Sequence, residues 1–295
     1  MSRTLVRIAT LAGMAVAAVM APAGAQPPSQ YGGYGPPPPT FYPEQLDQLV
    51  SRIALYPDPL LAQVLTAATY SNEIPDAAGW ANAHRYLTGD ALAGAIQQDN
   101  LPWDPSIMAL LPFPNVLDTM ARDMGWTQQL GNAVLADRGA VMDAVQRMRQ
   151  RAYDYGYLRD NQYDRVIYTP GAIQIMPVAP GYLYVPFYNP AVVFYRPARG
   201  VVIGGAITFG PRIFVGGGFA PFGWGNAGFG WREHTVIIDR RPWERTWVNR
   251  DRYVHPYYVR PPHYEGPRVE RHEIHEYRED RGRGDRGREH ERERH

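Results

Sequence analysis

Two aspartates in this chain share a local setting that could support chemistry. Asp58 lies in LYPDPLLAQVL and Asp104 in LPWDPSIMALL, each shortly after an aromatic residue and directly before proline and an apolar run. A carboxylate beside an aromatic ring could bind a sugar or act as a general acid or base. Aspartate is also a preferred N-cap, and proline is favoured at the first helical position. The apolar faces that follow favour helix capping over catalysis at both residues.

Two tryptophans add a second kind of candidate. Trp103 and Trp126 could line a groove for a glycan or a peptide, although single aromatic residues at helix boundaries more often pack in the core. We therefore take Asp58, Trp103, Asp104 and Trp126 as candidate binding residues, and we assign no catalytic residue.

Metal and thiol chemistry have little support in the sequence. His272 and His275 in RHEIHE are weak candidates for metal ligands, because their spacing does not match the H-E-x-x-H pattern. The composition around them favours solvated chain over a metal site. The chain contains no cysteine, which excludes thiol catalysis and cysteine-ligated zinc. The sequence predicts no cofactor.

The elements that position these residues change type along the chain. From residue 44 to about 160, apolar residues recur at helical spacing. The longest helix is predicted from Thr127 to about Tyr155, with Gly131 and Gly139 as positions that could divide it. Residues 161–198 contain short β-branched and aromatic runs broken by Gly and Pro, which predict a small antiparallel sheet. Strand-like residues after Asn189 predict a turn there.

The predicted fold class is α+β, a mainly helical N-terminal domain followed by a small antiparallel β subdomain, with disordered flanks. Residues 1–25 have a basic start, an apolar stretch and APAGA, which is typical of a secretory signal peptide. Residues 26–43 form a linker rich in Pro, Gly and Tyr. Residues 240–295, rich in Arg, His and Glu, predict a disordered tail.

Residues 199–239 form a Gly-rich apolar segment that ends in a candidate strand, HTVIID. Within it, Val201 to Trp231 carries a single charge and could be taken for a membrane span. Its many glycines and two prolines favour short strands and loops over one continuous helix.

Several separated motifs resemble one known family. LVSRIALYPDPLLAQVLTAATY, LPWDPSIMALLPFPNVLDTM, GWTQQLGNAVLADRGAVMDAVQRMRQRAY and YVPFYNPAVVF together resemble DUF3300, a bacterial family of exported or membrane-associated proteins of unknown function. The resemblance covers roughly Gln45 to Tyr195, within a 44–198 region that combines the helical domain (44–160) and the β subdomain (161–198). It implies a bacterial envelope protein, and it supplies no activity, cofactor or catalytic residue.

These features predict a non-enzymatic protein of the bacterial cell envelope with an interaction or scaffolding role. It would be exported by the Sec route and contact an envelope protein, or an anionic envelope polymer or lipid surface, with membrane association open and nucleic acid excluded. One alternative is a hydrolase or glycan-active enzyme that uses Asp58 or Asp104. Another is a membrane-integral protein that inserts through Val201 to Trp231. The sequence does not indicate an oligomeric state.

Overall fold

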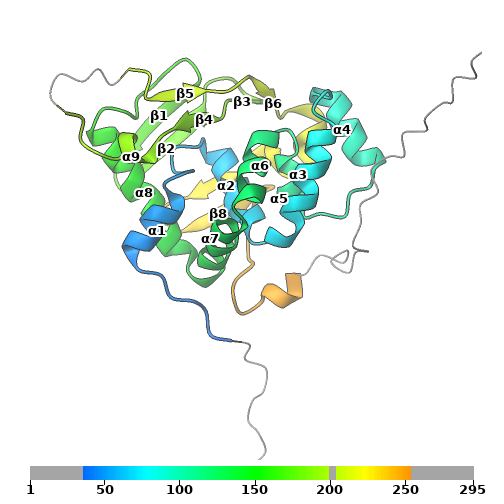
Figure 1. Cartoon of the computed structure of the whole chain (residues 1–295), viewed down its shortest axis with the longest axis horizontal. Coiled ribbons are helices and arrows are strands. Elements are labelled where there is room, and N and C mark those ends of the chain that lie inside the picture. The colour runs from blue at the N-terminus through cyan, green and yellow to red at the C-terminus, as the bar shows by residue number, and fades with distance from the viewer. Residues whose placement is uncertain (1–35, 199–203, 254–295) are drawn as a thin grey trace, which may run out of the picture. The chain divides into compact units, whose positions relative to one another are not determined.

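Residues 36–198 and 204–253 are described by the computed structural model of this chain (Figure 1). Helices dominate as far as residue 154 and short strands follow, so the predicted α+β class is confirmed. The α-helices are α1 (Pro43–Val50), α2 (Asp58–Ala68), α3 (Ile74–Ala83), α4 (Gly89–Gln98), α5 (Pro105–Leu110), α6 (Pro114–Arg122), α7 (Met124–Ala136), α8 (Arg138–Asp154) and α9 (Pro190–Val193). The strands are β1 (Asp164–Thr169), β2 (Ala172–Pro177), β3 (Tyr182–Leu183), β4 (Pro186–Tyr188), β5 (Ile207–Phe209), β6 (Ile213–Phe214), β7 (Gly228–Gly230), β8 (Thr235–Ile238) and β9 (Arg241–Pro242). Four short 3-10 helices are η1 (Ser71–Glu73), η2 (Gly217–Phe222), η3 (Trp224–Asn226) and η4 (Arg250–Tyr253) within these ranges.

Helix α2 is the centre of the core. Its sequence, DPLLAQVLTAA, is apolar around almost its full circumference, which is the pattern of a helix buried on all sides. Every residue of α2 except Pro59 is buried. It packs against α5, α7, β2, β7 and β8, and Figure 1 shows α2 near the middle of the helices. Elements from both halves of the chain therefore share one core.

The long helix predicted from Thr127 to Tyr155 is two helices, α7 and α8. The break falls at Asp137, whose carboxylate accepts a hydrogen bond from the backbone N–H of Ala140 at 2.9 Å and so caps α8. Neither Gly131 nor Gly139 makes the break. A local side-chain cap decides the boundary, because it satisfies an N–H group that the start of a helix leaves unpaired.

The strands form small antiparallel pairs around the helices. β1 and β2 make a hairpin in which Val166 lies opposite Ile175. β3 pairs with β6, β4 pairs with β5, and β7, β8 and β9 form a three-stranded sheet. The turn predicted at Asn189 is instead the N-cap of the one-turn helix α9, since its side chain accepts from the N–H of Ala191 at 2.9 Å.

The Gly-rich segment packs into the core. Its described part, residues 204–239, forms short strands and the 3-10 helices η2 and η3, not one continuous helix. Phe219, Phe222, Trp224 and Trp231 are buried, and the Trp224 indole donates to the carbonyl of Ala109 at 2.9 Å. The apolar character that raised the membrane-integral alternative is thus the character of core residues. Within the described ranges, no helix combines the length and the apolar character that crossing a membrane requires.

Residues 240–253 also differ from the predicted tail, because they are held against the helices. The buried guanidinium of Arg245 donates to the carbonyl of Thr69 at 2.9 Å and stacks on Tyr70 at 4.0 Å. The N–H of Trp247 donates to the carbonyl of Leu135 at 2.8 Å. The predicted signal peptide, residues 26–35 of the linker, and His272 and His275 lie outside the described residues.

Gly131 provides a test of how closely α2 and α7 approach. A Cβ at this position would lie 2.1 Å from the carbonyl oxygen of Ala68. We expect Gly131→Ala to destabilise the fold by about 1–3 kcal/mol, although alanine is the better helix former. Urea unfolding measures this. Gly79→Ala in α3, where nothing lies within 4 Å of the added Cβ, is the matched control and should be neutral or stabilising. Equal effects at both positions would contradict the close approach.

Candidate binding cleft built on a buried ion pair

Asp58 and Arg149 form a buried ion pair between α2 and α8. Arg149 is fully buried, and its Nη1 donates to Asp58 Oδ1 at 2.6 Å and to the carbonyl of Ile173 at 2.7 Å. Its Nε and Nη2 donate to the carbonyls of Ala54 at 2.8 Å and Tyr56 at 2.9 Å. All three guanidinium nitrogens are thus bonded, which a buried charge requires.

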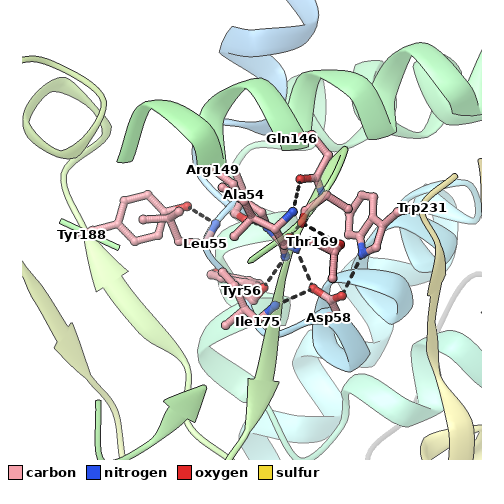
Figure 2. Close-up of polar contacts among 12 residues, drawn as sticks. Ala54, Leu55, Tyr56, Asp58, Gln146, Arg149, Thr169, Ile175, Tyr188 and Trp231 are labelled. Atoms are coloured by element: carbon pink, nitrogen blue, oxygen red, sulfur yellow. Dashed lines mark hydrogen bonds and ion pairs between the residues drawn. The ribbon is translucent and has the colours of Figure 1, made fainter. Parts of the chain in front are cut away.

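Both oxygens of the Asp58 carboxylate also accept hydrogen bonds. Its Oδ1 also accepts from the N–H of Ile175 at 3.2 Å, and its Oδ2 accepts from the indole of Trp231 at 2.9 Å (Figure 2). The Arg149 guanidinium lies over the indole ring of Trp231, with its Cζ 5.0 Å from the ring centroid. Asp58 does not cap α2, whose N-cap position is Pro57. The predicted capping role of Asp58 was wrong, because this carboxylate serves a long-range ion pair.

Side chains from α8 and α2 complete the outer edge of β2. Gln146 accepts from the N–H of Ile173 at 2.7 Å and donates to the carbonyl of the same residue at 3.2 Å. Together with the Arg149 and Asp58 bonds to Ile173 and Ile175, these contacts take the place of a further strand. Figure 2 shows Gln146 and Arg149 extending from α8 toward this edge. The edge is therefore satisfied by side chains, which removes an exposed pairing surface.

An open cleft lies directly above this network. It has a volume of about 600 Å³ and lies between α8, the β1–β2 turn and the connection from β7 to β8. Gln146 and Trp231, which contact Ile173 and Asp58 below, also line the cleft, so the ion pair fixes its floor. Phe229 stacks on Trp231 with ring centroids 4.2 Å apart. The charged side chains of the lining have both signs, with Asp143 and Glu233 negative and Arg232 positive, and Gln174 and His234 add polar groups.

His234 and Asp143 form an exposed part of the cleft wall. His234 Nε2 lies 2.8 Å from Asp143 Oδ1, and both side chains are about half exposed, at 45% and 57%. His234 has a positive φ of 50°, which is uncommon for a residue other than glycine. Such a conformation persists where the surrounding contacts determine it.

A second hollow adjoins the first along α8. It has a volume of about 430 Å³ and shares Asp143, Gln146 and the β1–β2 turn with the cleft. Tyr168 lines it and is 55% exposed. The two hollows form a groove that Tyr168 lines in the smaller hollow and Phe229 lines in the larger one.

The other sequence-predicted residues do not join Asp58. Asp104 caps α5 as predicted, because its Oδ1 accepts from the backbone N–H of Ser106 at 2.9 Å. The N–H of Asp104 donates to Glu73 at 2.8 Å, and burial raises the pKa of the Glu73 carboxyl to about 7. Trp103 and Trp126 are buried, and the Trp126 indole donates to the carbonyl of Leu49 at 2.8 Å. Neither tryptophan lines the cleft.

Sequence reasoning missed Arg149, Gln146, Trp231, Asp143 and His234. One signal was available for Arg149. It follows Val145 by four residues and precedes Ala152 by three, so it lies on the buried stripe of α8. An arginine on an apolar stripe indicates a buried charge that needs a partner. No comparable signal marks the remaining residues. Among the described residues, no group of three or more His, Asp or Glu side chains could hold a metal ion.

The fold and this site describe an α+β domain in which helices and a Gly-rich segment share one core around a buried Asp–Arg pair. The chain belongs to the DUF3300 family, described as a protein of unknown function, which it matches over residues 42–263. The resemblance predicted from motifs within 45–195 is confirmed. The match also continues through the Gly-rich segment, in agreement with its place in the core.

One relative is the uncharacterized protein YacH of Escherichia coli (strain K12). It is 34% identical over 186 residues, which cover 52% of this chain and 30% of YacH. This chain therefore matches less than a third of that protein's length. No solved structure matches this chain.

Serine substitution separates the roles of the two aspartates, because serine caps helices about as well as aspartate but carries no charge. We expect Asp58→Ser to destabilise the fold by about 3–5 kcal/mol, since Arg149 would be left without a counter-charge. Asp104→Ser should change stability by only about 0.5 kcal/mol. Denaturant unfolding followed by circular dichroism measures both. Similar losses in the two variants would show that Asp58 acts only as a local cap.

Asp164, near Arg149, should make stability depend on pH. It is 3% exposed, its Oδ1 has no hydrogen-bond partner in the described chain, and burial raises its pKa to about 7 against the opposing charge of Arg149. The folded chain therefore holds this proton more tightly than the unfolded chain does. Stability falls as pH rises from about 4, the unfolded pKa, to about 7, by on the order of 3–4 kcal/mol.

Asp164→Asn removes that titration. We expect the variant to match the wild type near pH 4 and to exceed its stability near pH 8. Thermal unfolding across this range measures the difference. Asp154→Asn, at the exposed end of α8, is the control and should leave the pH profile unchanged. A variant that is no more stable than the wild type at pH 8 would show that the ionised Asp164 carboxylate is accommodated.

Proposed function

We propose that this chain is a non-enzymatic binding protein of the bacterial cell envelope, and that it holds a glycan strand in the groove along α8. The observation that carries the proposal is the pair of adjoining hollows, about 600 and 430 Å³, flanked by Tyr168 and Phe229. Aromatic faces suit the apolar faces of sugar rings, and polar side chains between them suit hydroxyl groups.

The charge of the groove supports a neutral ligand. The carboxylates of Asp143 and Glu233 are balanced by Arg232 in the larger hollow and by Arg147 in the smaller one. An anionic polymer would meet two carboxylates here, so this groove is a poor site for the anionic partner considered from the sequence. A hydroxyl-rich polymer can both donate to the carboxylates and accept from Arg232 and Gln174.

The rigidity of the floor also supports binding. Gln146 and Trp231 are held by the buried ion pair and by the edge of β2, so their positions are set before a ligand arrives. A preformed site loses less conformational entropy on binding. The envelope location rests on the N-terminal pattern of residues 1–25 and on the bacterial envelope character that the family resemblance implies.

A hydrolase remains the second candidate, because His234 and Asp143 lie 2.8 Å apart at the mouth of the cleft. A histidine paired with a carboxylate can serve as a general acid or base. Asp58, which was the earlier candidate for this role, has both oxygens bonded inside the core and cannot reach a ligand. This pair therefore replaces Asp58 and Asp104 in the enzymatic alternative.

Binding to purified peptidoglycan sacculi, measured by co-sedimentation, tests the proposal. We expect the wild type to bind saturably, and Tyr168→Ala and Gln174→Ala to weaken binding roughly 3- to 10-fold through lost stacking and hydrogen bonds. Tyr86→Ala is the matched control, because Tyr86 is an exposed tyrosine, 77% accessible, that lines neither hollow. Absence of binding by the wild type, or an equal loss in Tyr86→Ala, would reject the groove as a glycan site.

The same incubation distinguishes the two candidate functions. Release of soluble reducing ends by the wild type, abolished in His234→Gln while sedimentation persists, would establish the hydrolase in place of the non-enzymatic protein. Binding without release supports the proposal as stated.

A further inference from the structure

A second concave site lies at the other end of the helical core. Its volume is about 240 Å³, and it is enclosed by the α3–α4 connection, the α5–α6 connection, β4 and the loop between β5 and β6. Leu92, Phe113, Phe187 and Phe214 contribute to its largely apolar wall. It shares no lining residue with the groove along α8. The two sites are therefore chemically and spatially distinct.

The charges around this pocket have one sign. Its lining includes Arg85 and Arg212 and contains neither aspartate nor glutamate. In a chain with 29 acidic and 30 basic residues, both signs would be expected around a site without charge preference. The N-termini of α4 and α6 border the same rim, and neither N-cap, Thr88 or Phe113, caps with its side chain. Their dipoles add partial positive charge there.

Arg212 is the cation available to a ligand. Arg85 is already paired with Asp118, at 2.9 Å. Arg212 makes no ion pair with any carboxylate of the described chain, and its guanidinium stacks on the ring of Tyr182 at 3.5 Å from the centroid. Stacking fixes the plane of the guanidinium and leaves its N–H groups at the edge, where they can bind an anionic group bidentately.

We propose that this pocket binds a single-chain amphiphile with an anionic head group, such as a fatty-acid carboxylate. The alkyl chain would occupy the apolar interior and the carboxylate would contact Arg212 at the rim. The volume suits one chain, and an apolar pocket with few convergent polar groups is the usual form of a small-ligand site. Charge complementarity selects the anionic head over neutral or cationic ones.

Three ligands with an eight-carbon main chain test the head-group preference: octanoate, 1-octanol and octyltrimethylammonium. Isothermal titration calorimetry at neutral pH measures the affinities, below the micellar concentration of the two ionic ligands and below the solubility limit of octanol. We expect octanoate to bind roughly 3- to 10-fold more tightly than octanol, and the cation to bind most weakly. Equal affinities for octanoate and octanol, or no saturable binding of any of the three, would overturn the proposal.

Variants then locate the site. Arg212→Gln should remove the preference for octanoate and leave the affinity for octanol unchanged. Arg165→Gln is the matched control, because Arg165 is an exposed arginine on β1 that lines neither this pocket nor the groove. Phe187→Ala should weaken both ligands, since the Phe187 ring is part of the apolar wall and, at 43% exposed, is not needed for the core. A preference that survives Arg212→Gln, or that is lost equally in Arg165→Gln, would exclude Arg212 as the anion contact.

Further measurements distinguish binding in this pocket from unfolding of a variant, from binding to a membrane surface and from binding in the groove. Circular dichroism melts confirm that each variant remains folded. Co-sedimentation with phosphatidylglycerol vesicles, compared with phosphatidylcholine vesicles, tests for a membrane surface. Sedimentation with the anionic vesicles without octanoate binding would assign the positive rim to a bilayer and overturn the amphiphile site. The groove variants Tyr168→Ala and Gln174→Ala should leave octanoate binding unchanged, so the two proposals fail independently.

Discussion

The ion pair between Asp58 and Arg149 is the contact on which the rest of the structure depends. Desolvating two charges is expensive, and their attraction offsets that expense only where every remaining polar atom is bonded. Here the guanidinium reaches four oxygen acceptors, and the carboxylate accepts from Arg149, Ile175 and Trp231. The pair therefore forms only when α2, α8, β2 and the segment that carries Trp231 are all in place. We interpret it as a device that specifies one assembly more than as a source of net stability.

This requirement explains why the Gly-rich segment belongs to the core. Trp231 lies 173 residues after Asp58, so the hydrogen bond from its indole connects the C-terminal part of the described chain to the helices of the N-terminal half. The aromatic residues of the segment fill space, and the glycines permit close approach. A Cβ at Gly218 would lie 2.7 Å from the Cβ of Ala93 in α4, so a larger residue there would separate η2 from the helix. The high glycine content of this segment, which is typical of loops, is here explained by its close packing against the helices.

The sequence was sufficient for features that depend on local chemistry. Apolar periodicity located the helical half, and β-branched and aromatic runs broken by Gly and Pro predicted the antiparallel strands that follow it. The capping rule correctly described Asp104. The same rule failed at Asp58. The residues around Asp58 resemble those around Asp104, but the partner that decides its role, Arg149, lies 91 residues away in the sequence. The groove was not predictable for the same reason. Only tertiary packing makes neighbours of Gln146, Phe229 and His234. None of the three lies in a sequence motif that indicates a role in binding.

Both concave sites require both halves of the chain. The groove needs α8 and the β1–β2 turn from one half, and Phe229, Trp231 and His234 from the other. The apolar pocket needs the α3–α4 and α5–α6 connections together with Arg212 and Phe214. A chain that ended at residue 199 would therefore lack one wall of each concave site. It would also leave Asp58 without its Trp231 donor. Because a ligand that binds only the assembled state stabilises it by mass action, occupancy of either site would hold the Gly-rich segment on the helices. The binding of any ligand at either site would thus be linked to completion of the core.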